Sequence, residues 1–97
     1  MVTDMMIYNK ILSRILQEQE TILGSLAWQL AEKISGLKVI NRETFEIRII
    51  GDPKSVIDSF IFKCERVFGS FAKDASKQAA AYLLAEMPKD DIPTRLR

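Results

Sequence analysis

The stretch FEIRIIGDP, residues 45–53, decides the fold of this chain. Apolar and charged side chains alternate from Phe45 to Ile49, which is the period of a β-strand with one face on a core, and the predicted strand continues to Ile50. Gly51 then ends the strand, and Asp52 is suited to cap a helix. Pro53 is suited to the first helical position, where no backbone N–H is needed. The stretch therefore predicts a strand that passes directly into a helix.

A shorter strand precedes this one. Residues 37–40, LKVI, are apolar except for Lys38 and partly β-branched, and the turn between the two strands is centred on Arg42 and Glu43. That turn lacks the glycine of a tight hairpin. We predict an antiparallel hairpin whose inner face is formed by Phe45, Ile47 and Ile49.

The residues before the hairpin predict one long amphipathic helix that begins near Met5 and stops at Gly36. Thr3 and Asp4 are suited to cap its start. Its apolar side chains recur at spacings of three and four, the period of one helical face. The polar run 17–21, followed by Gly24, marks where this helix could kink or break.

The residues after Pro53 predict a second long helix, which Gly69 could bend or divide. Its apolar stripe comprises Val56, Ile57, Phe60, Ile61, Cys64, Val67, Phe68, Phe71, Ala75, Ala79, Leu83, Leu84 and Met87. Pro88 follows its end. Residues 89–97 are short and polar, so we predict a single domain over residues 1–88 and an exposed, flexible tail over residues 89–97.

The predicted fold class is α+β: a long helix, a β-hairpin and a second long helix. Unbroken helices of about 31 and 35 residues would span roughly 45–50 Å. A compact globule of 97 residues has a radius of gyration of about 13 Å, so two such rods do not close into a compact monomer. We therefore predict a symmetric homodimer with its helices packed on a small antiparallel sheet. The alternative is that the helices break at Gly24 and Gly69 and fold back.

Two bulky aromatic side chains lie off these apolar stripes. Trp28 and Phe62 are predicted to contact a partner for that reason. The strand face of Phe45, Ile47 and Ile49 is the other predicted contact surface. The alternative is that the stripes are simply wide, or that a broken helix turns the two rings inward.

Composition narrows the function classes. The 14 basic and 13 acidic residues give a net charge of +1, unlike the strongly basic balance of most nucleic-acid binders. The chain has no histidine, and its one cysteine, Cys64, is predicted to be a buried core thiol. We therefore expect no enzyme, no zinc site and no cofactor. No apolar run is long enough to span a bilayer and no signal peptide is apparent, so we expect a cytoplasmic protein without membrane association.

Three functions remain open. The leading hypothesis is a non-enzymatic, homo-oligomeric interaction or adaptor module that binds a protein partner. The second is a small transcriptional or nucleic-acid-associated regulator. Its contacts would be basic side chains of the hairpin and second helix: Arg42, Arg48, Lys63 and Arg66. The third is a sensor or carrier that holds an apolar ligand between aromatic side chains: Trp28, Phe60, Phe68 and Phe71.

Overall fold

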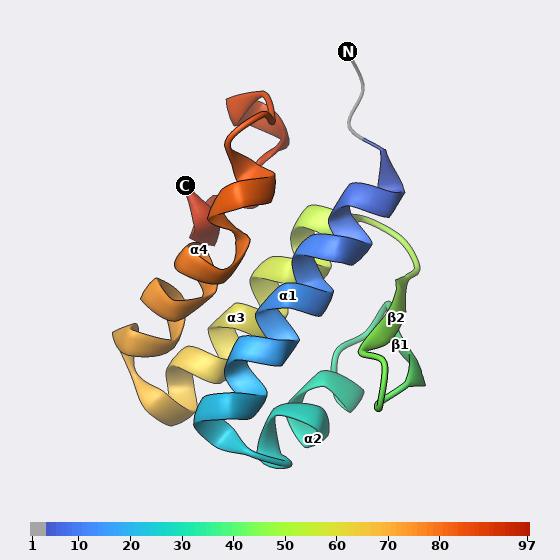
Figure 1. Ribbon diagram of the computed structural model, residues 1–97, viewed down its shortest axis with the longest axis vertical. Helices are drawn as coiled ribbons and strands as arrows, with labels where there is room; N and C mark the ends of the chain where they lie inside the picture. The colour runs from blue at the N-terminus through green and yellow to red at the C-terminus, as the bar shows by residue number, and fades with distance from the viewer. Residues whose placement is uncertain (1–3) are drawn as a thin grey trace.

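The computed structural model describes residues 4–97, so the predicted capping residue Thr3 lies outside the described residues. This part of the chain forms a compact α+β fold of four α-helices, one hairpin and two 3-10 turns. The elements are α1 (Met5–Leu23), α2 (Leu26–Glu32), β1 (Leu37–Asn41), β2 (Glu46–Ile49), α3 (Pro53–Phe68), α4 (Ser70–Leu84), η1 (Lys89–Asp91) and η2 (Thr94–Leu96). α1 lies between the hairpin and α4, and α3 passes behind it (Figure 1).

Both predicted long helices are broken, and each break is at a glycine. Gly24 has φ 62° and Gly69 has φ 79°, in the left-handed region that glycine adopts without steric cost. The N–H of Gly24 donates to the carbonyl of Glu20 at 2.8 Å, and that of Gly69 to the carbonyl of Glu65 at 2.6 Å. The prediction of continuous helices was therefore wrong, and the alternative of breaks at these two glycines is confirmed.

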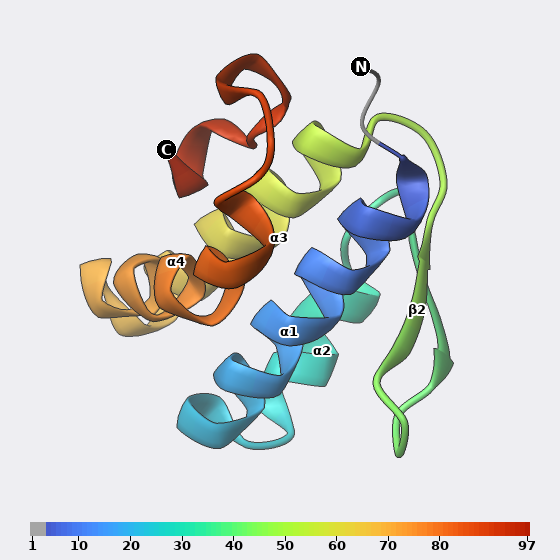
Figure 2. The same ribbon diagram turned by 45° about the horizontal axis from the view of Figure 1, so that its top comes forward.

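The folded-back helices make the single chain compact. The radius of gyration of its Cα atoms is 12.0 Å, close to the value of about 13 Å for a globule of this length. In a second view, α4 runs back beside α1 and α3 (Figure 2). Helix length therefore no longer argues for a dimer, and any self-association must rest on a surface that the monomer leaves exposed.

The polar run 17–21 does not break α1, because one of its members is part of the core. Gln19 is fully buried, and its Nε2 donates to the carbonyl of Ala72 at 2.9 Å and to Ser76 Oγ at 3.0 Å. These bonds join α1 to α4 and satisfy the buried amide nitrogen. The rest of the buried face of α1 comprises Ile11, Leu12, Ile15 and Leu16, as the periodicity predicted, together with Tyr8.

The two strands pair antiparallel, as predicted, with Leu37 opposite Ile49 and Val39 opposite Ile47. In place of a glycine, Phe45 takes the left-handed position of the turn, with φ 60°, so β2 begins one residue later than predicted. This backbone conformation costs a residue other than glycine about 1–2 kcal/mol. Ser13 Oγ donates to the carbonyl of Phe45 at 2.8 Å and so fixes the turn against α1.

The predicted helix starts are both found. The side chain of Asp4 accepts a hydrogen bond from the N–H of Met6 at 2.7 Å, which caps α1. Asp52 occupies the N-cap position of α3, and Pro53 is the first helical residue. The carboxylate of Asp52 accepts a hydrogen bond from Ser55 Oγ at 2.6 Å, and this bond lowers the pKa of Asp52.

Residues 89–97 differ from the exposed tail that was predicted. They form η1 and η2 and pack on α3 and α4, with Pro93 and Leu96 buried. The segment is polar in composition, but its two apolar anchors are spaced so that both reach the core. The compact unit therefore extends beyond the predicted boundary at residue 88.

Candidate functional site

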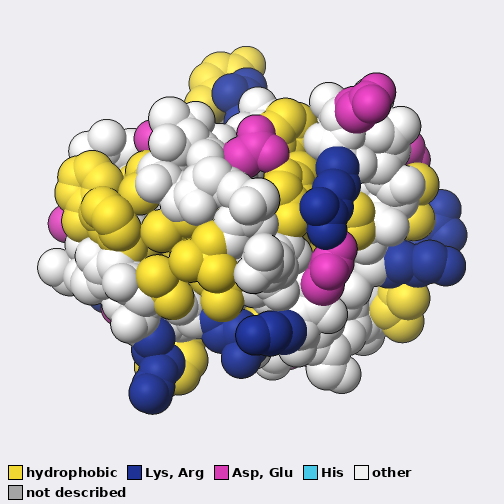
Figure 3. Space-filling model, turned by 90° about the horizontal axis from the view of Figure 1, so that it is seen from below, with side chains coloured by type: hydrophobic (Ala, Val, Ile, Leu, Met, Phe, Trp, Pro, Cys, Tyr) yellow, Lys and Arg dark blue, Asp and Glu magenta, His cyan; other side chains and the backbone are white. Residues whose placement is uncertain are grey.

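Three large apolar side chains remain exposed where α3 meets α4. Val67 is 48% exposed, Phe68 47% and Phe71 57%, and the centroids of the two rings are 5.6 Å apart. We call these three residues the aromatic corner. Figure 3 shows hydrophobic side chains gathered at this end of the molecule, where α1 and α3 end and α4 begins, with Lys and Arg beside them. Contiguous exposed apolar surface of this kind is typical of a binding site.

The aromatic corner exists because the helix breaks at Gly69, so that α3 and α4 do not continue one apolar face. The sequence predicted Val67, Phe68 and Phe71 as members of one core-facing stripe, and this prediction was wrong. The left-handed backbone of Gly69 ends α3 and starts α4 in a new direction. The α4 face toward the core then carries small side chains: Ala72, Ala75, Ser76 and Ala80. The bulky rings on either side of the break are left at the surface.

Opposite charges flank the aromatic corner. Arg66 precedes it on α3 and Asp74 follows it on α4, and both are exposed. Neither forms an ion pair with another residue in the described range 4–97. The guanidinium of Arg66 lies 5.8 Å from the centroid of the Phe62 ring. The corner therefore has an apolar centre and a polar rim of mixed sign.

Most of the predicted contact residues lie inside the single chain. Ile47 and Ile49 are 6% and 4% exposed and belong to the core, and Trp28 is 2% exposed. These three side chains are therefore packed within the single chain, and Trp28 points inward because α2 is a separate short helix. Phe45 is half-buried against Trp28, with ring centroids 5.4 Å apart. Phe62 is 42% exposed, and the guanidinium groups of Arg66 and Arg95 lie near its ring.

Trp28 is held from several sides, an arrangement that we call the tryptophan clamp. Its indole N–H donates to the carboxylate of Glu20, and Phe45 packs against its ring. The guanidinium of Arg42 lies 5.6 Å from the ring centroid and pairs with Glu32. An open cleft of about 510 Å³ lies beside the clamp, with Glu20 and Glu43 among its lining residues. The clamp ties the hairpin turn to α1 and α2.

The aromatic side chains predicted to enclose an apolar ligand do not meet around one cavity. Phe60 is fully buried, Phe68 and Phe71 form the aromatic corner, and Trp28 is in the clamp. The four basic residues predicted to contact nucleic acid are also separated. Arg42 and Arg48 lie on the hairpin, whereas Lys63 and Arg66 lie on the second half of α3, across the molecule in Figure 1.

Cys64 is fully buried in α3, as predicted. Burial raises the pKa of its thiol to about 12, with a further contribution from the negative charge of Glu65. The thiol is therefore protonated at neutral pH and is a poor nucleophile. Among residues 4–97, no group of three or more Cys, Asp or Glu side chains is placed to hold a metal ion. No helix in this part of the chain is long and apolar enough to cross a membrane.

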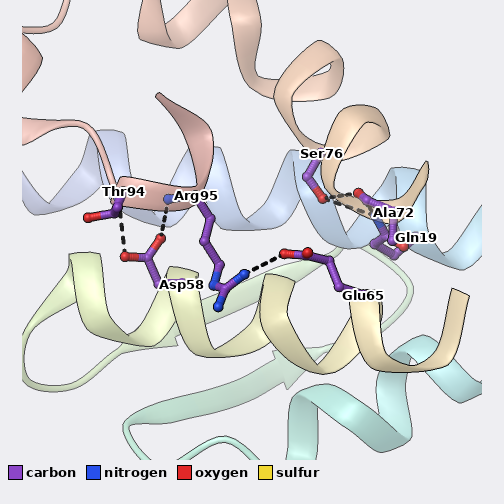
Figure 4. A network of polar contacts seen from close by, with 7 residues as sticks. All are labelled: Gln19, Asp58, Glu65, Ala72, Ser76, Thr94 and Arg95. Atoms are coloured by element: carbon purple, nitrogen blue, oxygen red, sulfur yellow. Dashed lines mark hydrogen bonds and ion pairs between the residues drawn. The ribbon is translucent and has the colours of Figure 1, made fainter. Parts of the chain in front are cut away.

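Two polar networks were not predicted from the sequence. One is the buried contact of Gln19 with Ala72 and Ser76, and the other joins residues 94 and 95 to α3 through Asp58 and Glu65 (Figure 4). Gln19 could have been found, because it follows Ile15 by four residues and so lies on the apolar stripe. The second network has no such signal, because it depends on where residues 89–97 fold back.

No family model, curated protein or solved structure matches this chain.

Proposed function

We propose that this chain is a non-enzymatic interaction module that associates with a second copy of itself through the aromatic corner. The observation that carries the proposal is the exposure of Val67, Phe68 and Phe71 side by side on an otherwise well-packed chain. Aromatic side chains are enriched at the centres of protein interfaces. Burying the exposed half of one phenylalanine ring would contribute about 1–2 kcal/mol to association.

The flanking charges support a second copy as the occupant. A two-fold axis through the corner places the same surface on both sides of the contact. We place this axis between Arg66 and Asp74, so that Arg66 on α3 faces the partner's Asp74 on α4 and the reciprocal pair forms across the axis. Such an interface buries the aromatic rings at its centre and pairs two charges that have no ion-pair partner within residues 4–97 of one chain.

Sedimentation equilibrium across the micromolar range tests this proposal. We expect a monomer–dimer equilibrium that Phe71→Ser weakens by about tenfold or more, since tenfold corresponds to about 1.4 kcal/mol. Tyr82→Ser is the matched control, because Tyr82 is an aromatic residue of the same helix, is 82% exposed and lies outside the corner. A wild-type chain that stays monomeric, or an equal loss of association in Tyr82→Ser, would contradict the proposal.

A second candidate function is the binding of nucleic acid on the outer face of the hairpin. Lys38 lies directly opposite Arg48 there, and neither has an ion-pair partner among the described residues. Like charges facing each other across two strands are destabilising, so an anion between them would be favourable. Duplex binding at low salt that Arg48→Ala weakens would support this function. Absence of binding to any duplex or single strand would rule it out.

A further inference from the structure

Residues 93–96 lie along α3 as a short segment held by side chains of one helix face. Pro93 and Leu96 are buried, Leu96 being only 3% exposed, while Thr94 is exposed. The segment is linked to the end of α4 by residues 85–92, which contain the single 3-10 turn η1. Its apolar residues therefore enter the core, and two of its backbone N–H groups and the Arg95 side chain face α3.

Three side chains of α3 recognise different parts of this segment (Figure 4). The carboxylate of Asp58 accepts hydrogen bonds from the backbone N–H groups of Thr94, at 3.2 Å, and Arg95, at 3.0 Å. The carboxylate of Glu65 accepts a hydrogen bond from the guanidinium of Arg95 at 2.7 Å. Asp58 thus binds the backbone at the start of η2, and Glu65 binds the side chain of Arg95.

An aromatic ring completes the contact. The guanidinium of Arg95 lies 4.6 Å from the centroid of the Phe62 ring, within the range of a cation–π interaction. Asp58, Phe62 and Glu65 are spaced by four and three residues, so they share one face of α3. The side chains of Arg95 and Glu65 are 33% and 21% exposed, so the pair is shielded only in part. We call Asp58, Phe62 and Glu65 the α3 groove.

We propose that the α3 groove is a recognition site for a linear partner segment of the type Pro-x-Arg-Leu, and that residues 93–96 are its occupant within the chain. The bound segment itself shows which chemistry fits. Two adjacent backbone N–H groups meet a carboxylate, a guanidinium meets a second carboxylate and a ring, and proline and leucine side chains are buried. A partner segment with these groups makes the same contacts once residues 93–96 leave.

The linkage within the chain sets how this competition works. A segment joined by a short connection competes at an effective concentration of about millimolar order. A free peptide therefore binds the wild-type chain with reduced apparent affinity, because the open groove is only a small fraction of the population. Substitutions at residues 95 and 96 that weaken the docking of this segment should raise the fraction of chains with an open groove, and they leave the side chains of α3 unchanged.

Fluorescence anisotropy of a labelled peptide of residues 88–97 tests the proposal on the full chain. The Arg95→Ala, Leu96→Ala double variant should bind this peptide at least about tenfold more tightly than the wild-type chain. Adding Asp58→Asn to that variant should reduce the affinity again, because it removes the charge that accepts the two N–H groups. A peptide of the same composition in scrambled order is the control probe.

Circular dichroism establishes that each variant is folded, and Arg95→Ala alone replaces the double variant if the loss of Leu96 unfolds the chain. The proposal is overturned if a folded, tail-weakened chain does not bind the peptide. It is also overturned if the scrambled peptide binds equally well, or if Asp58→Asn leaves the affinity unchanged. Exchange of residues 93–96 between two copies, with no binding of free peptide, would likewise refute a partner segment as the occupant.

Discussion

The molecule contains two aromatic pairs of similar geometry and different surroundings. Trp28 and Phe45 have ring centroids 5.4 Å apart, and Phe68 and Phe71 have centroids 5.6 Å apart. Trp28 is 2% exposed and is covered by Arg42 and Glu20, whereas both phenylalanines are about half exposed. Contact between two rings therefore does not by itself distinguish a pair that stabilises the fold from a pair that forms a binding surface. The difference lies in whether the chain itself covers the rings.

Stability measurements should separate the two pairs most clearly. Trp28→Ala removes a buried ring and leaves a cavity, so we expect a loss of about 3–5 kcal/mol in the free energy of unfolding. Phe71→Ala removes a ring that is 57% exposed, and we expect a loss of about 1 kcal/mol or less. Urea denaturation at a concentration where the chain is monomeric measures both. Equal losses would show that the corner, like the clamp, is part of the core.

The backbone of Phe45 offers a sharper test of the clamp. Phe45→Ala removes the ring contact with Trp28 but keeps a β-carbon at φ 60°. Phe45→Gly removes the same ring and also relieves the left-handed strain, a gain partly offset by the greater freedom of glycine in the unfolded chain. Both variants should be less stable than wild type, and the glycine variant should be more stable than the alanine variant by about 1 kcal/mol. The reverse order in urea denaturation would mean that this position carries no strain.

The same contrast shows how far the sequence could be read. The second strand of the hairpin, the helix start at Asp52 and Pro53, and most of the buried stripe of α1 follow from short-range patterns, and all are present, although the strand ends at Ile49 and not at Ile50. The burial of Trp28 does not follow from such a pattern. It depends on the Gly24 break, which makes α2 a separate helix with its own orientation.

The aromatic corner could not be predicted from the sequence for a related reason. Phe68 and Phe71 fit the apolar period of one continuous helix, and only the backbone of Gly69 takes them off the core face. A glycine in a helical pattern signals that a break can occur, but the new direction of the chain is set by packing against α1. The docking of Pro93 and Leu96 likewise depends on long-range contacts with α3 and α4.

The smallest expected effect concerns the charges at the rim of the corner. If Arg66 faces the partner's Asp74, then Arg66→Glu or Asp74→Lys alone should weaken the dimer by about twofold to fivefold, the range of exposed ion pairs. The double exchange should restore part of the affinity, because each new pair again joins opposite charges. Sedimentation equilibrium at low and high salt measures the coupling, which salt should reduce. Additive losses in the double variant would leave the aromatic corner as a contact surface but would exclude the two-fold arrangement that pairs these residues.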